Sequence, residues 1–229
     1  MSCTKHHFGI LAFFSLLCLT FPILADDSPV PADPALAAKA PIPEAIVEFL
    51  GGDEKSLEFG SMGEGAPEEM AQFGQLTGLW HCHQYAFVQG QWFDGWDALW
   101  AWRYGVGGFV IEDYWYQPEA NLPPTMTGFG RDVHLLNLRV FDSAAGFWRV
   151  AWLSNTNGVN GSTPFGTFEA SLDGEGRLVM TPPPVEGQPL RRIVFQKMTA
   201  KSFEWLRQVS EDDGKSWETR FRIEATRIR

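Results

Sequence analysis

The sequence predicts an all-β protein, an antiparallel up-and-down β-barrel of about ten strands preceded by a short helix. From Trp80 onward, short runs rich in aromatic and β-branched residues alternate with turn clusters such as Gln89-Gly90 and Asp213-Gly214, with almost no helical period. These runs follow one another at hairpin spacing, without crossover helices. A meander of this length protects its edges best by closing on itself, so we expect a closed barrel, with an open sandwich as the alternative.

The chain divides into one short helix and a series of strands. The helix is expected to begin at Pro67, with acidic residues in its first turn, and to end at Gly78. Its apolar face carries Met70, Phe73 and Leu76. The expected strands cover about 79–88, 92–104, 108–116, 127–141, 147–154, 165–172, 177–181, 190–198, 202–210 and 216–227.

Alternate residues of a strand point to opposite faces of the sheet, so each expected strand can be sorted into an apolar and a polar face. The even positions of 96–104 are Trp96, Ala98, Trp100, Trp102 and Tyr104. In 132–140, the even positions run from Asp132 and His134 to Val140, whereas Asn137 and Arg139 lie on the odd face. We expect the even faces of both strands to point inward.

Three segments are expected along the chain. Residues 1–25 have the layout of a secretory signal peptide, with Lys5, an apolar run from Phe8 to Leu24, and cleavage after Ala25. Residues 26–66 form a flexible lead-in rich in Pro, Ala and Gly, and residues 67–229 form the barrel domain. The expected location is therefore periplasmic or secreted, and no second apolar run predicts a membrane span.

Charge and cysteine content exclude several classes of function. The formal net charge is −10, without a run of basic residues, which argues against nucleic acid and against anionic membrane surfaces as partners. After cleavage, Cys82 is the only thiol, so an intrachain disulfide, a zinc ribbon and an iron–sulfur cluster are excluded. No cofactor is predicted, and oligomeric state is left open.

The start of the first strand, Gly78-Leu79-Trp80, resembles the Gly-x-Trp opening of lipocalins and related calycin barrels. The resemblance implies that Trp80 packs at the barrel base under an arginine from the last strand. In that strand, Arg227 shares the odd, apolar face with Phe221 and Ile223, and a cation–π contact with Trp80 would satisfy its charge. We therefore assign Gly78, Trp80 and Arg227 to the base of the barrel.

Three longer stretches resemble an uncharacterised bacterial family of lipocalin-like domains of unknown function, over roughly residues 74–229. They are Leu138-Arg-Val-Phe-Asp-Ser-Ala-Ala-Gly-Phe-Trp-Arg-Val-Ala-Trp152, Ser202-Phe-Glu-Trp205 and Ser210-Glu-Asp-Asp-Gly-Lys-Ser-Trp217. The family has no established activity, so the resemblance implies a fold and no reaction.

The His81-Cys82-His83 triplet places two imidazoles on one face of a strand, but two histidines do not make a zinc site. If Trp80 points inward, Cys82 also points inward and becomes a small buried side chain, while both histidines point outward. No metal site is predicted.

Polar and aromatic residues expected inside the barrel are the candidates for a ligand site. Asp132 can orient His134 as a general base or as a polar anchor. Glu112 and Asp113 lie on opposite faces, so one of them points inward, to pair with Arg131, Arg139 or Arg149 or to bind a ligand. Dense tryptophans form either core or the walls of an apolar pocket. The complete set of candidates is Trp96, Trp100, Trp102, Glu112, Asp113, Trp115, Asp132 and His134.

The leading hypothesis is an exported protein that binds a small, largely apolar molecule inside the barrel. The second is an isomerase or cyclase that uses His134 and Asp132, although no nucleophile is apparent beside them and an enzyme is the less favoured class. Heme binding is disfavoured, because no histidine follows His134. The last hypothesis is a sealed barrel that binds a partner protein.

Overall fold

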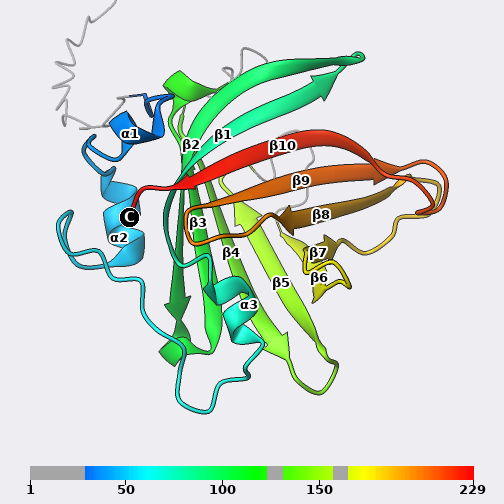
Figure 1. Ribbon diagram of the computed structural model, residues 1–229, viewed down its shortest axis with the longest axis horizontal. Helices are drawn as coiled ribbons and strands as arrows, with labels where there is room; N and C mark the ends of the chain where they lie inside the picture. Colours follow the sequence, from blue (N-terminus) through cyan, green and yellow to red (C-terminus); the bar gives the residue numbers. More distant parts are fainter. Residues whose placement is uncertain (1–28, 123–130, 157–164) are drawn as a thin grey trace, which may run out of the picture.

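A computed structural model describes residues 29–122, 131–156 and 165–229 (Figure 1). The signal peptide predicted for 1–25 lies outside the described residues. The helices are α1 (Pro34–Ala37), α2 (Glu44–Leu50) and α3 (Met70–Gly74), with the 3₁₀ turns η1 (Val106–Gly108) and η2 (Glu119–Asn121). The strands are β1 (Gly78–Val88), β2 (Gln91–Gly105), β3 (Val110–Gln117), β4 (Val133–Asp142), β5 (Phe147–Ser154), β6 (Gly166–Leu172), β7 (Leu178–Thr181), β8 (Leu190–Gln196), β9 (Ser202–Ser210) and β10 (Glu218–Arg227).

The strands form one closed antiparallel barrel in which each strand pairs with its neighbours in sequence and β10 closes on β1. The predicted fold class is therefore confirmed, and most strand bounds agree with those expected. The β4 strand begins at Val133; of the expected start of this strand, residues 127–130 lie outside the described residues, and 131–132 are not in a strand. None of the helices among the described residues is long and apolar enough to cross a membrane.

The end of the barrel where β1 begins is called the base, and the end where β1 finishes is called the mouth. At the base, the guanidinium carbon of Arg227 lies 4.1 Å from the ring centroid of Trp80. The indole of Trp80 donates to the carbonyl of Leu76 at 2.7 Å, and Arg227 donates to carbonyls that follow α3. The contact expected between the first and last strands is thus present, and it joins them to α3.

Residues 29–66 differ from the flexible lead-in expected for 26–66. The helices α1 and α2 lie against the outside of the barrel (Figure 1), and Ile46 and Leu50 are buried against Leu79 and Leu99. The apolar residues of this segment are few, but the outer faces of β1, β2 and β3 carry matching apolar side chains. Packing of the two surfaces compensates for the chain entropy lost when the segment becomes ordered.

The inner face of β4 is the odd one, opposite to the prediction. Val133 and Leu135 pack in the core together with Arg139, whereas Leu138 and Val140 lie outside and are 38% and 44% exposed. The prediction placed the face with Arg139 outside because that face is more polar. It fails because the interior supplies the carboxylate of Asp113 as a partner for this arginine. The even face of the strand 96–104 does point inward, as predicted: Ala98, Trp100 and Trp102 are core residues.

Candidate functional site

The base half of the barrel has a solid aromatic interior. Phe73 of α3 enters it, and its ring centroid lies 5.0 Å from that of Trp148 and 6.2 Å from that of Trp102. Trp102 is fully buried, and Trp100 and Trp115 are only 5% and 6% exposed. These three tryptophans, predicted either as core or as walls of a ligand pocket, are core residues, because other side chains occupy the space beside them.

A charged cluster lies within this interior. Asp113 and Arg139 form a buried ion pair, and the carboxylate also accepts hydrogen bonds from Trp100 Nε1 at 2.5 Å and Asn137 Nδ2 at 2.8 Å. The Arg139 guanidinium carbon lies 4.4 Å from the ring centroid of Trp102. Burial lowers the pKa of Arg139 to about 9, which leaves it charged at neutral pH. Of the alternatives weighed for Asp113, the structure shows pairing with Arg139.

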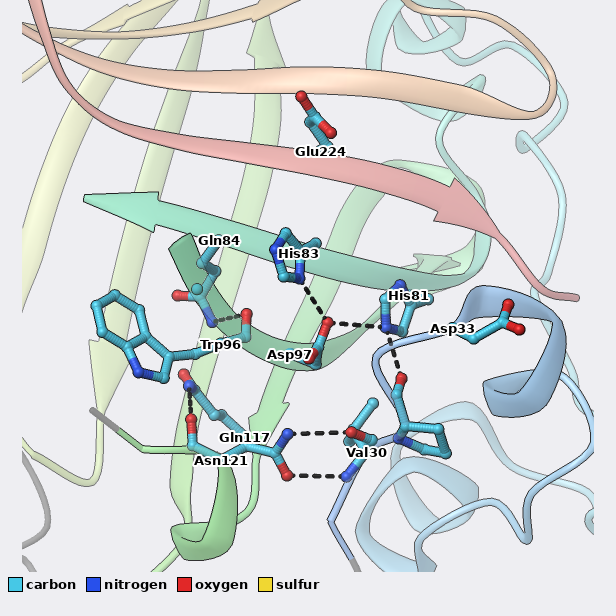
Figure 2. Close-up of polar contacts among 12 residues, drawn as sticks. Val30, Asp33, His81, His83, Gln84, Trp96, Asp97, Gln117, Asn121 and Glu224 are labelled. Carbon is cyan, nitrogen blue, oxygen red and sulfur yellow. Dashed lines mark hydrogen bonds and ion pairs between the residues drawn. The ribbon is translucent and has the colours of Figure 1, made fainter. Parts of the chain in front are cut away.

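The predicted residues Glu112 and Trp96 are separated from this cluster. Glu112 lies on the outer side of β3, where its carboxylate accepts a hydrogen bond from Arg103 Nε at 2.7 Å. Trp96 lies opposite Gln84 in the sheet, nearer the mouth, and is half-buried. Its carbonyl accepts a hydrogen bond from Gln84 Nε2 at 3.2 Å (Figure 2).

Asp132 and His134 lie on the outside of the barrel, and no hydrogen bond joins their side chains. The Tyr114 hydroxyl and His134 Nδ1 lie 2.6 Å apart and are hydrogen-bonded. Asp132 accepts from the Tyr116 hydroxyl at 3.0 Å and from the amide of Glu119 at 2.9 Å. Partial burial lowers the pKa of His134, against the opposing effect of Asp132. The geometry expected of a carboxylate-oriented base inside a cavity is absent from this pair.

The two histidines of β1 point outward, as the alternation predicts, and both contact Asp97 of β2 (Figure 2). His83 lies between two carboxylates, with Nδ1 2.8 Å from Asp97 and Nε2 2.7 Å from Asp94. Partial burial opposes protonation of His83, but these hydrogen bonds raise its pKa. Ionised carboxylates only accept hydrogen bonds, so the two contacts favour the imidazolium form of His83, in which both ring nitrogens donate.

His81 joins the barrel to the N-terminal segment. Its Nε2 lies 2.9 Å from the carbonyl of Pro31, so this nitrogen carries a proton and donates. Beside it, the amide and carbonyl of Val30 are both hydrogen-bonded to the side chain of Asn121 (Figure 2). The imidazole is buried beneath the segment, so it is a structural contact in place of the surface histidine that we expected.

Several inward-facing apolar side chains toward the mouth are only partly buried. Leu135, Phe168, Ile193, Trp205 and Phe221 all pack against the core and all remain half-buried. These side chains therefore keep solvent-accessible surface on the inner face of the sheet.

Alternation in the sequence places Trp152 on the inner face with Trp148, yet Trp152 is half-buried, whereas Trp148 is fully buried. Its indole lies over Gly166, where a Cβ would come within 1.7 Å of Nε1. Apart from Trp96, the residues nearer the mouth were absent from the predicted site, because alternation gives the face of a residue and not its distance from the base.

In the part of the chain that the structure covers, no group of three or more His, Cys, Asp or Glu side chains is arranged to hold a metal ion. Cys82 is a free, buried thiol on the inner face, as predicted, and burial raises its pKa well above the ordinary value. A buried thiol with a raised pKa is a poor nucleophile.

Compared with known protein families and with curated proteins, the chain matches no family model and no curated relative. The assignment of function therefore depends on the geometry of the barrel.

Proposed function

We propose that this protein binds a small, largely apolar molecule in the mouth half of its barrel. The observation that carries the proposal is the solvent access of inward-facing apolar residues, Phe168, Ile193, Trp205 and Phe221 among them. Burying such surface under a ligand is favourable by about 25 cal/mol per Å² of apolar area. The proposed site lies nearer the mouth than Trp100, Trp102 and Trp115, because these three tryptophans already pack against one another.

The rigid base supports this function. The rings around Phe73, together with the Asp113–Arg139 pair, fill the lower interior, so a ligand in the mouth would rest on a preformed floor. Asn137 of this floor is half-buried and already donates to Asp113. A preformed apolar surface with few polar groups is the usual construction of a small-molecule site.

The test uses a neutral apolar fluorophore, N-phenyl-1-naphthylamine, with the purified protein. We expect saturable binding of one probe, weakened by Phe168→Ala and Trp205→Ala. The matched control is Leu153→Ala, because Leu153 lies on the outer face of β5 and is 42% exposed. Absence of any saturable binding would refute the proposal, and so would equal binding by the inner and outer variants.

Native mass spectrometry of protein from an exporting host gives a second measurement. An additional mass that dissociates on denaturation identifies the class of the natural ligand. We also propose that the chain is exported and cleaved after Ala25. In support of this site, Val30 is already buried and hydrogen-bonded to Asn121, so the proposed cleavage leaves this contact in the mature chain. N-terminal sequencing should find Asp26 first, and an intact Met1 in the exported protein would contradict the proposal.

A further inference from the structure

Two arginines point into the barrel at its mouth. Arg207 of β9 lies on the same face of its strand as the inward residues Phe203 and Trp205. Its cross-strand partners are Ile193 of β8 and Phe221 of β10, both inward-facing. The guanidinium carbon lies 5.4 Å from the ring centroid of Phe221. A cation is therefore placed among the apolar residues of the proposed ligand site.

Arg191 lies two residues before Ile193 on β8 and faces the same way. The alternation of β8 places it inward with Phe195, and its Nη2 lies 3.2 Å from Gln188 Oε1. Its charge acts on Arg207, and this repulsion is a secondary cause of the lowered pKa of Arg207. Arg191 pairs with Val209 and so lies diagonal to Arg207, and an anion between the two would reduce their repulsion.

Within the described ranges, neither arginine has a carboxylate partner. This distinguishes both from the arginines on the outer faces, several of which form ion pairs: Arg103 with Glu112, Arg149 with Asp142, Arg220 with Glu218 and Arg222 with Glu224. The inward-facing carboxylate of Asp113 is bound to Arg139. Outside these ranges, segments 123–130 and 157–164 contain no acidic residue in their sequence, and the only acidic residues of 1–28 are Asp26 and Asp27.

Arg207 is accessible to solvent and also close to other protein groups. Its side chain is exposed, its guanidinium lies over the ring of Phe221, and burial against the surrounding protein lowers its pKa. Arg207 thus lies where an anion can reach it through water and form charge-assisted hydrogen bonds.

We propose that the ligand is an amphipathic anion, with an oxyanion head bound by Arg207 and Arg191 and an apolar part lying on Phe221, Trp205, Ile193 and Phe168. This inference rests on the proposed function and adds the charge and orientation of the ligand. The head group is a carboxylate or a phosphate, because a guanidinium presents paired N–H donors to either one.

The test compares three ligands with the same chain, namely dodecanoate, dodecyl phosphate and 1-dodecanol, each measured by displacement of N-phenyl-1-naphthylamine at pH 8. We expect at least one anion to bind about tenfold or more tightly than the alcohol. Arg207→Gln should weaken anion binding by about 10- to 100-fold, the range for charge-assisted hydrogen bonds, and change alcohol binding less than about twofold. The tighter anion identifies the head group.

Arg149→Gln is the matched control, because it removes an exposed arginine from the outer face of β5; it should leave all three affinities unchanged. Arg207→Lys should restore part of the anion preference, and thermal unfolding of each variant verifies the fold. Equal binding of the alcohol and both anions, or equal weakening of all three by Arg207→Gln, overturns the inference while leaving the apolar site intact. Failure of the fluorophore itself to bind overturns the proposed function instead.

Discussion

Asp113 of β3 and Arg139 of β4 form an ion pair in the interior of the barrel, where their side chains are 0% and 2% exposed. The carboxylate receives further hydrogen bonds from Trp100 and Asn137, and the guanidinium lies between the rings of Trp102 and Phe73. Each charge is compensated by groups from other elements. The pair therefore links β2, β3, β4 and α3 at the floor of the proposed ligand site.

Removing one member of this pair should be costly. Arg139→Met leaves Asp113 as a buried, uncompensated charge, and we expect a loss of about 3–5 kcal/mol in the free energy of unfolding, measured with urea. The double variant Asp113→Asn/Arg139→Met should recover part of that loss, because the isolated charge is gone. A single variant that loses less than about 1 kcal/mol would show that the pair does not carry this role.

The packing of α2 on the barrel can be tested with two aliphatic residues. Ile46 is fully buried, so Ile46→Ala should lower the free energy of unfolding by about 2–5 kcal/mol. Leu36 of α1 is 56% exposed, and Leu36→Ala should change it by less than about 0.5 kcal/mol. Equal, small effects in urea unfolding would indicate that the lead-in is a tether, as the sequence suggested.

The stability contributed by His83 should depend on pH. Its pKa is raised in the folded state, so its contribution is fully present below the unfolded value of about 6.5 and is lost as pH rises through the folded value. Its partners Asp94 and Asp97 have lowered pKa values and stay ionised throughout this window. We expect His83→Gln to destabilise the protein more at pH 6 than at pH 9.

The stability contributed by His134 should depend on pH in the opposite direction, because its pKa is lowered in the folded state. Protonation of His134 therefore opposes folding as the pH falls, and His134→Gln should be relatively less destabilising at pH 6 than at pH 9. Urea unfolding of both variants across this range measures the difference. The same pH dependence for the two variants would contradict the assigned charge states.

Gly78 allows Arg227 to reach Trp80. A Cβ at this residue would lie 2.0 Å from Arg227 Nη1, and its φ of +142° is one that L side chains rarely adopt. Gly78→Ala should therefore lower the melting temperature by several degrees, corresponding to about 1 kcal/mol or more. Gly174→Ala is the control, because no atom lies within 4 Å of its added Cβ. Equal melting temperatures for both variants would contradict the packing at the base.

The amino-acid sequence by itself determined the class of fold, the positions of most strands, the inward face of β2 and the meeting of Trp80 with Arg227. These features follow from local rules, since turn residues separate the strands and alternation assigns their faces. Alternation also placed Glu112 and Asp113 on opposite faces, but it left open which of them points inward.

Only the tertiary structure decided which face of β4 is buried, because the burial of Arg139 depends on a carboxylate and on rings supplied by other elements. The same reason explains the lead-in, whose short helices gain their stability from an apolar surface formed by distant strands. It also explains the site. Trp102, near the base, is buried in the core, whereas Trp205, nearer the mouth, keeps solvent-accessible surface. The position of each residue along the barrel determines what packs beside it, and this position depends on strand register and on the insertion of Phe73.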